Sequence, residues 1–97
     1  MMENENITYT LEFEEQALKE IKSLKKSEKQ AYNKLIKILE ELRHHPTTGS
    51  GKPELLKYNY SGFYSRRISQ KHRIIYSVND REIIVNVISA KSHYDDK

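Results

Sequence analysis

Cysteine and tryptophan are absent from this sequence of 97 residues, and glycine and proline are rare, with three and two copies. The lack of cysteine excludes a disulfide framework and thiolate metal sites. No apolar run approaches the roughly 20 residues needed to span a bilayer, so we expect no membrane association. Residues 1–6 are acidic and polar, unlike a signal peptide. This composition favours a cytoplasmic protein. The length predicts a single domain over residues 1–97, and we also expect the ends at 1–7 and 95–97 to be flexible.

Acidic residues are scarce in one part of the chain. Across the whole sequence there are 17 Lys and Arg and 14 Asp and Glu, for a formal net charge of +3. Residues 52–76 hold six basic side chains and one acid, Glu54, whereas the sequences on either side are nearly balanced. The six are Lys52, Lys57, Arg66, Arg67, Lys71 and Arg73. A positive excess this local predicts a binding site for anions, most simply for the phosphates of a nucleic acid.

The hydrophobic pattern predicts an α+β fold. Alternating residues over 9–13 predict a first strand, and helical spacing predicts two helices that form a hairpin, the second ending near 43–45 before Pro46. Four short strands follow, over 54–58, 63–69, 72–78 and 82–89, with turn residues between them. Consecutive hairpins pair antiparallel strands. We therefore expect a mostly antiparallel sheet with the helix hairpin packed on one face.

The same pattern predicts which residues form the core. The inward positions of the helices are Ala17, Leu18, Ile21 and Leu24, then Tyr32, Leu35, Ile36, Leu39 and Leu42. Ser27, with Gln30 three residues later, is typical of a capping box at the start of the second helix. Strand 72–78 alternates between an apolar and a mixed face, so we expect one buried face and one open, cationic face. The two sets are Ile74, Tyr76 and Val78, and Arg73, Ile75 and Ser77.

Tyrosines are interleaved with the basic residues. They are Tyr58, Tyr60, Tyr64 and Tyr76, with Tyr94 further on. Aromatic rings among cations suit single-stranded RNA, because bases stack on the rings while Lys and Arg meet the phosphates. The same rings are equally suited to packing in the core or at the edge of the sheet. The pattern leaves both interpretations open for Tyr64 and Tyr76.

Glu54, Arg73 and His93 carry the groups that RNA cleavage requires when no metal or other cofactor takes part. The 2′-hydroxyl must lose a proton, the phosphate must bear extra negative charge, and the 5′-oxygen must gain a proton. A carboxylate, a guanidinium and an imidazole suit those three roles. Spacing does not decide whether they meet, since a Glu beside a Lys is usually a surface pair and a His near the C-terminus usually faces solvent.

Four motifs follow one another along residues 51–94. They are Gly51-Lys52-Pro53-Glu54-x-Leu56-Lys57, Ser61-Gly62-Phe63-Tyr64-Ser65-Arg66-Arg67-Ile68, His72-Arg73-Ile74-Ile75-Tyr76 and His93-Tyr94. Together they resemble the signature of the Txe/YoeB toxins of the RelE/ParE superfamily, over roughly residues 7–94. The resemblance implies a compact α+β fold with an N-terminal strand, two helices and an antiparallel sheet. It also implies a ribosome-dependent endoribonuclease that cuts mRNA at the A-site codon and so inhibits translation.

The resemblance further implies partners for the chain. An antitoxin of the YefM/Phd type would wrap the toxin and cover or distort its active site, and an exposed basic groove suits such an acidic, partly disordered partner. The ribosome and its A-site mRNA would be the targets. Operator DNA would be bound only through the antitoxin complex, and toxin homodimers also occur in the family.

The resemblance assigns roles to individual residues. Glu54 would be the general base, Arg73 would stabilise charge on the scissile phosphate, and His93 would be the general acid, giving a 2′,3′-cyclic phosphate. Tyr94 would stack on or orient a base of the codon. Flanking phosphates or ribosomal RNA would be held by Lys52, Lys57 and Arg67. Arg66 alternates to the other face of its strand, so we assign it to the structure or to weaker binding.

Two alternatives belong to other functional classes. One is a non-catalytic toxin on the same scaffold, like the ParE inhibitors of DNA gyrase, although such relatives generally lack this Glu, His and Tyr set. The other is a module that binds RNA or a partner protein without cleaving. The basic residues alone would give such a module a binding affinity that falls steeply with salt.

Overall fold

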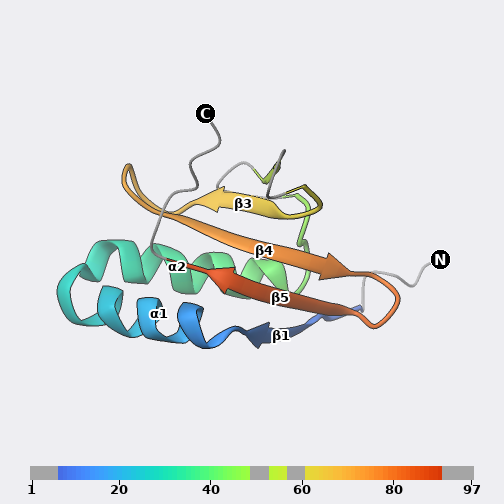
Figure 1. The fold of residues 1–97 in the computed structure, drawn as a ribbon, viewed down its shortest axis with the longest axis horizontal. Helices are drawn as coiled ribbons and strands as arrows, with labels where there is room; N and C mark the ends of the chain where they lie inside the picture. Colours follow the sequence, from blue (N-terminus) through green and yellow to red (C-terminus); the bar gives the residue numbers. More distant parts are fainter. Residues whose placement is uncertain (1–6, 49–52, 57–60, 91–97) are drawn as a thin grey trace.

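The computed structural model describes residues 7–48, 53–56 and 61–90 (Figure 1). The elements are β1 (Thr10–Phe13), α1 (Glu15–Ser27), α2 (Lys29–Leu42), β2 (Glu54–Leu55), β3 (Tyr64–Arg67), β4 (Arg73–Asn79) and β5 (Ile84–Ser89). The α+β class and the element order predicted from the pattern are confirmed. Of the predicted strand 54–58, residues 57 and 58 lie outside the described residues. The predicted flexible ends also lie outside them, apart from the exposed Ile7.

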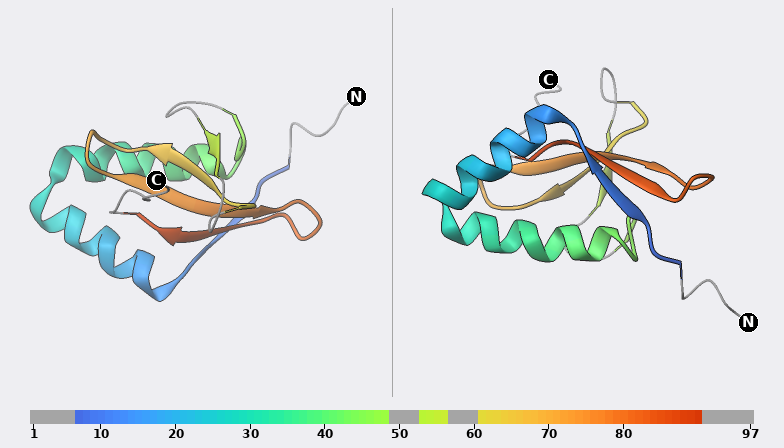
Figure 2. Two further views of the ribbon diagram at one scale, coloured as in Figure 1. Left: turned by 45° about the horizontal axis from the view of Figure 1, so that its top comes forward. Right: turned by 90° about the horizontal axis from the view of Figure 1, so that it is seen from below.

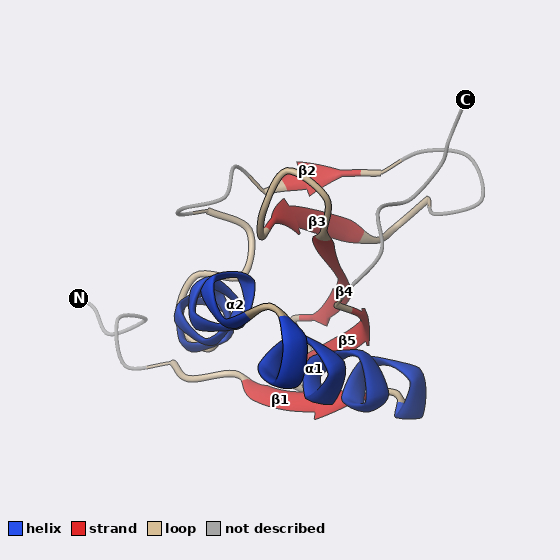
Figure 3. Ribbon diagram, turned by 90° about the vertical axis from the view of Figure 1, so that its left-hand side faces the viewer, coloured by secondary structure: helices blue, strands red, loops and turns tan. Residues whose placement is uncertain are grey.

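The five strands form one sheet in the order β1-β5-β4-β3-β2. The edge strand β1 runs parallel to β5, and the other three pairs are antiparallel. Both helices cover the same face of the sheet, as the end-on view in Figure 3 and the turned views in Figure 2 show. Among the described residues, no helix covers the opposite face of β2, β3 and β4. In the described parts of the chain, no helix is both long and apolar enough to cross a membrane.

A single residue, Glu28, joins the two helices. Its backbone N–H donates to the carbonyl of Leu24 at 2.8 Å, and its own carbonyl accepts from Tyr32 N–H at 2.9 Å. The predicted capping box is wrong, because no side chain caps α2 and the Ser27 hydroxyl instead donates back to the carbonyl of Ser23 at 2.9 Å. A one-residue linker leaves Ser27 inside α1, where its hydroxyl meets the preceding turn.

The core lies between the helices and the sheet. Its fully buried members are Ala17, Leu24, Leu35, Ile38, Leu42, Ile74, Tyr76, Val85, Val87 and Ala90. Two predicted inward residues are wrong, since Leu18 is 53% and Ile36 is 43% exposed. Successive helix residues are about 100° apart, so both lie well to one side of the buried neighbours Ala17 and Leu35. Ile38, which is absent from the predicted set, is buried instead.

The two faces of β4 differ as predicted, with one correction. Ile74 and Tyr76 are buried in the core and Val78 packs against it, which confirms the inner face. The outer face is less open than expected, because Ile75 on β4 and Ser65 on β3 are also buried. The open cationic face is therefore restricted to particular positions.

The corrected helix faces lead to a stability prediction. Ile38→Ala should lower the free energy of unfolding by about 2–5 kcal/mol, because it removes a buried side chain and leaves a cavity. Ile36→Ala, two residues away on the same helix, should cost less than about 1 kcal/mol. Urea unfolding of the two variants measures the difference. Equal costs would contradict the observed orientation of α2.

Tyr9 fastens the N-terminal segment to two other parts of the fold. Its hydroxyl donates to Asp80 Oδ1 in the turn between β4 and β5 at 2.6 Å, and its backbone N–H donates to the carbonyl of Arg43 at 2.7 Å. The hydrogen bond to Asp80, then burial and the charge of that carboxylate, raise the pKa of Tyr9 from 10.0 to about 12.

This pKa shift predicts a pH dependence of stability. The raised pKa means that folding favours the neutral phenol, so the stabilisation from Tyr9 is complete below pH 10 and is lost as the pH rises through about 12. The difference in unfolding free energy between the wild type and Tyr9→Phe should therefore shrink from pH 9 to pH 12. Urea titrations across that range test it, and a constant difference would exclude the Tyr9–Asp80 contact as its source.

Candidate nucleic-acid site on the open face of the sheet

Three strands bring Glu54, Ser65 and Arg73 together on the face that the helices leave free. Glu54 on β2 pairs with Ser65 on β3, and Ser65 pairs with Ile75 on β4, two residues from Arg73. Directly paired residues and residues two apart in a strand share a face, so these side chains point the same way. Arg73 Nη1 donates to Glu54 Oε1 at 3.3 Å and to Ser65 Oγ at 3.1 Å.

The three side chains differ in exposure in a way that suits chemistry on an outside molecule. Ser65 is fully buried, the Arg73 side chain is 20% exposed, and the Glu54 side chain is 52% exposed. The guanidinium thus donates hydrogen bonds to a buried hydroxyl and to an exposed carboxylate, which together restrict its orientation. An arginine with a fixed orientation can bind two oxygens of a phosphate at once. The neighbouring carboxylate remains accessible and can exchange a proton with a bound molecule.

A second arginine lies on the same face of the sheet. Arg67 is exposed and pairs directly with Arg73 across β3 and β4. Like charges directly opposite each other in a sheet are destabilising. Glu54 offsets part of this repulsion, and a bound anion between the two arginines would offset more. The Arg67–Arg73 pair therefore supports the predicted anion-binding surface.

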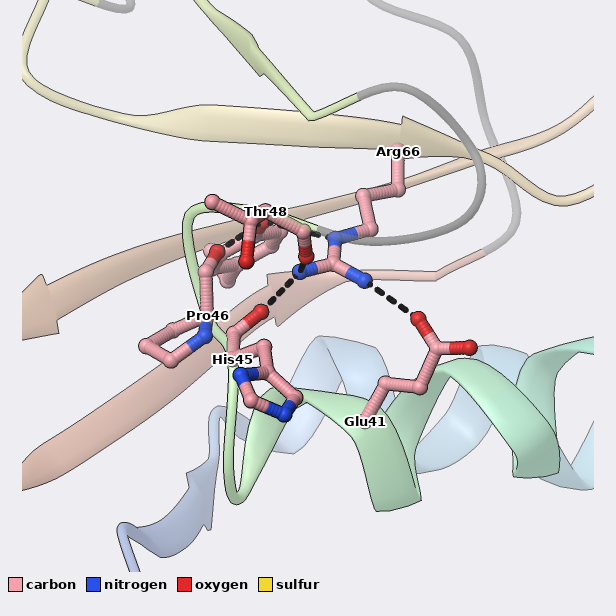
Figure 4. A network of polar contacts seen from close by, with 6 residues as sticks. Glu41, His45, Pro46, Thr48 and Arg66 are labelled. Atoms are coloured by element: carbon pink, nitrogen blue, oxygen red, sulfur yellow. Dashed lines mark hydrogen bonds and ion pairs between the residues drawn. The ribbon is translucent and has the colours of Figure 1, made fainter. Parts of the chain in front are cut away.

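Arg66 faces the other way and belongs to the core. It is fully buried, and its guanidinium donates to Glu41 Oε1 at 3.0 Å, to the Tyr76 hydroxyl at 3.1 Å and to the carbonyls of His45 and Thr48 (Figure 4). These partners lie on α2, on β4 and in the segment that follows α2. Arg66 thus takes the structural role that its position in the strand predicts.

Tyr64 and Tyr76 stack on each other and pack on the core side of the sheet. Their ring centroids are 5.8 Å apart, and Tyr76 is fully buried. The Tyr76 hydroxyl donates to the carbonyl of Pro46 at 2.6 Å, and burial raises its pKa although Arg66 acts in the opposite direction. The packing interpretation therefore holds for these two rings.

The described basic residues of the 52–76 segment divide into three kinds. Arg66 is buried. Lys71 is exposed in the turn between β3 and β4, where its ammonium lies 3.9 Å from a Glu28 oxygen. Of the basic residues that the structure describes in this segment, only Arg67 and Arg73 share the face of Glu54. Lys52, Lys57, His93 and Tyr94, with Tyr58 and Tyr60, lie outside the described residues.

Ser65 is the site residue that the sequence did not single out. Its type is unremarkable, and only the register of β3 against β2 and β4 places it beneath Arg73. The sequence did contain a signal for it: Ser65 is two residues before Arg67 in the predicted strand, so the two side chains share a face. Across residues 7–48, 53–56 and 61–90, no three His, Asp or Glu side chains gather closely enough to hold a metal ion.

The opposite orientations of two adjacent arginines allow a matched test. Arg66→Ala should lower the free energy of unfolding by about 3–5 kcal/mol, because it removes the buried guanidinium that donates to Glu41, to the Tyr76 hydroxyl and to two carbonyls. Arg67→Ala should change it by no more than about 0.5 kcal/mol and should weaken binding to RNA instead. Chemical unfolding and RNA binding at several salt concentrations measure both. A large stability loss for Arg67→Ala would contradict the assignment.

The chain is similar in sequence and in structure to proteins of one known family. Residues 13–94 match the family described as YoeB-like toxin of bacterial type II toxin-antitoxin system. The protein named Toxin YoeB from Escherichia coli O6:H1 is 40% identical over 68 residues, which cover 70% of this chain and 79% of that protein. The structure of a YoeB dimer from Staphylococcus aureus is similar with a TM-score of 0.79 and 34% identity, covering 90% of this chain and 99% of that one. A YoeB-YefM heterotetramer from the same organism gives 0.76 and 34%, covering 89% and 98%.

By its fold, two helices on one face of a five-stranded sheet in the described residues, the chain is similar to the YoeB toxin structures. Within that class the chain belongs to the family of YoeB-like toxins of bacterial type II toxin–antitoxin systems, because the family match covers 13–94 of its 97 residues. The resemblance found in the sequence motifs is therefore confirmed at the level of the family.

Proposed function

We propose that this toxin is an endoribonuclease that enters the ribosomal A site and cuts the bound mRNA codon, so that translation stops. The observation that carries the proposal is the contact between Arg73 and Glu54 on an open sheet face, with Arg67 directly opposite Arg73. This arrangement brings two cations and one accessible carboxylate to one face of the sheet. Phosphate attraction brings the strand to this face, and the carboxylate supplies a proton acceptor.

Each residue has a chemical task in the proposed reaction. Glu54 removes the proton of the 2′-hydroxyl, which then attacks the adjacent phosphorus. Arg73 stabilises the additional negative charge on the phosphate oxygens. Its hydrogen bond to the buried Ser65 hydroxyl keeps the guanidinium in place. His93 protonates the departing 5′-oxygen, leaving a 2′,3′-cyclic phosphate. Tyr94 orients a base of the codon.

The remaining basic residues hold the RNA rather than react with it. Arg67, Lys52 and Lys57 contact flanking phosphates or ribosomal RNA. The groups named are sufficient without a metal or another cofactor. The toxin acts in the cytoplasm, where translating ribosomes are found.

The proposed partner of this surface is an antitoxin of the YefM type. A YoeB-YefM complex and a YoeB dimer are among the solved structures that this chain resembles at 34% identity. An acidic segment laid along Arg67 and Arg73 would neutralise both cations and exclude RNA. The toxin would then meet operator DNA only as part of that complex. A toxin homodimer is the second assembly that we propose.

Substitutions at the site test the cleavage reaction. Glu54→Gln should slow single-turnover cleavage by about 10²–10⁴-fold, because the amide cannot accept the proton. Arg73→Gln should also slow it strongly, because the phosphate loses its charged partner. Lys71→Gln is the matched control, since it removes a positive charge from the same segment but from a turn beside Glu28. Primer extension on a defined mRNA in a purified translation system, with and without ribosomes, measures the new 5′ ends.

The same experiment separates the competing functions. New ends at A-site codons that require ribosomes and vanish in Glu54→Gln support the ribonuclease. Intact mRNA despite ribosome binding would instead indicate a binding module. Intact mRNA without ribosome binding, accompanied by double-strand breaks in DNA, would indicate an inhibitor of gyrase.

A further inference from the structure

The turn between β3 and β4 carries an arginine of the candidate site at each end. Arg67 is the last residue of β3 and Arg73 is the first of β4, and the two pair across the strands. Their like charges repel each other, so this end of the hairpin needs a restraint. Part of it is local: the carbonyl of His72 accepts from Ile68 N–H at 2.9 Å and from Ser69 N–H at 3.2 Å. Whatever else holds this turn in place also sets where the two arginine side chains leave the sheet.

One side chain of this turn points away from the site and into the fold. His72 is only 9% exposed, and its Nε2 lies 3.1 Å from Glu28 Oε2. Glu28 is the residue that joins the two helices, and Figure 1 and Figure 2 show this joint and the turn at the same end of the molecule. An ionised carboxylate can only accept hydrogen bonds, so Nε2 is the ring nitrogen that carries a proton and donates. His72 and Arg73 are thus adjacent residues, one fastened to the helices and the other on the open face.

Glu28 is a rigid anchor for the turn. Its backbone N–H donates to the carbonyl of Leu24 and its own carbonyl accepts from Tyr32 N–H, so hydrogen bonds on both sides fix its main chain. Its other carboxylate oxygen lies 3.9 Å from the Lys71 ammonium. That second contact adds little, because the Lys71 side chain is 73% exposed and water screens the pair. The bond to the buried imidazole is therefore the contact that joins the turn to the helices.

Stability alone does not account for a histidine at position 72. Among the described residues, its Nδ1 has no hydrogen-bond partner although the atom is buried. A buried polar atom without a partner costs free energy, and an apolar side chain of similar size would avoid that cost. The histidine supplies the one group that an apolar residue lacks, which is a donor for Glu28.

We propose that Glu28 is a positioning residue for the reaction: through its bond to His72 it holds the start of β4 and so fixes Arg73 against the scissile phosphate. The inference rests on the proposed ribonuclease function and adds to it a residue on the helix side of the sheet, which does not touch the RNA. Consecutive Cα atoms are only about 3.8 Å apart, so a shift of His72 moves Arg73 with it. A displacement of about 1 Å between reacting groups can cost about 100-fold in rate.

Two carboxylates that join the helices to the sheet give a matched pair of variants. Glu28→Ala should lower the rate constant of single-turnover cleavage at least ~10-fold, with little change in the concentration that gives half-maximal rate. Glu28→Gln keeps an oxygen acceptor for His72 Nε2–H and should stay within about threefold of the wild type. Glu14, which accepts from Asn86 Nδ2 at 2.9 Å, joins the start of α1 to β5 instead of β4. Glu14→Ala should therefore leave both quantities nearly unchanged.

A double-mutant cycle tests whether Glu28 acts through Arg73. In the Arg73→Gln background the guanidinium is already missing, so Glu28→Ala should then lower the cleavage rate by less than about twofold. A loss of at least ~10-fold in that background as well would overturn the proposal, because it would indicate general damage to the fold.

The same contact can be removed from the side of the histidine. His72→Phe keeps an aromatic ring but has no donor, and it should cleave at least ~10-fold more slowly than the wild type. His72→Gln restores an N–H donor for Glu28 and should recover most of the rate. These two variants keep the residue at the helix joint, so they decide the question even where Glu28→Ala fails to fold. Equal rates for the two would overturn the proposal.

A second measurement needs no catalysis. In NMR spectra of the free protein, Glu28→Ala should shift the guanidinium signals of Arg73 and the amide signal of Ser65, which its guanidinium contacts. Glu14→Ala should shift neither. Both variants should keep the remaining spectrum of the folded protein.

The two measurements distinguish failure of this inference from failure of the proposed function. If the wild type cleaves and Glu28→Ala cleaves at the same rate, the positioning role is wrong while the ribonuclease stands. If the wild type does not cleave under any condition, the ribonuclease is wrong. The NMR comparison then decides whether Glu28 holds Arg73 in place: unchanged Arg73 signals would reject that too. Equal rate losses for Glu14→Ala and Glu28→Ala would also overturn it, because they would indicate a general effect of loosening the helices from the sheet.

Discussion

The buried guanidinium of Arg66 is the contact on which the candidate site depends. It joins β3 to Glu41 on α2, to the Tyr76 hydroxyl on β4 and to the carbonyls of His45 and Thr48. A buried ion pair contributes little net stability, because desolvation offsets much of the attraction. Its effect here is on geometry: it fixes β3 against α2 and against the segment that follows α2, at His45 and Thr48.

The alternation of β3 then builds the open face. With Arg66 directed into the core, its neighbours Ser65 and Arg67 must point to the opposite side of the sheet. Ser65 supports Arg73 there, and Arg67 opposes it with a like charge. The four-residue strand β3 thus supplies both the buried Arg66 and the exposed Arg67, one of the two arginines of the anion-binding surface. The site and the core are coupled, since a change of register in β3 would exchange them.

The periodicity of apolar residues predicts most of the fold, whereas tertiary packing decides which neighbouring positions are buried. The α+β class, both helices and the strands of the sheet follow from repeating apolar positions. The inward assignments of Leu18 and Ile36 are wrong because each helix carries more apolar residues than its buried face holds, and these two lie beside that face. Which side is buried depends on how the helix settles on a twisted sheet. The capping box at Ser27 failed for a similar reason, because a linker of one residue leaves that serine inside α1.

The sequence by itself determined the fold class, the family resemblance, the local excess of basic residues and the candidate status of Glu54 and Arg73, because these depend on residue type and order along the chain. Only the tertiary structure decided that Arg66 is buried while Arg67 is exposed, that Ser65 lies beneath Arg73, and that Glu28 is bonded to His72. These facts depend on strand register and on contacts between residues up to 44 positions apart, and a local pattern in the sequence contains neither.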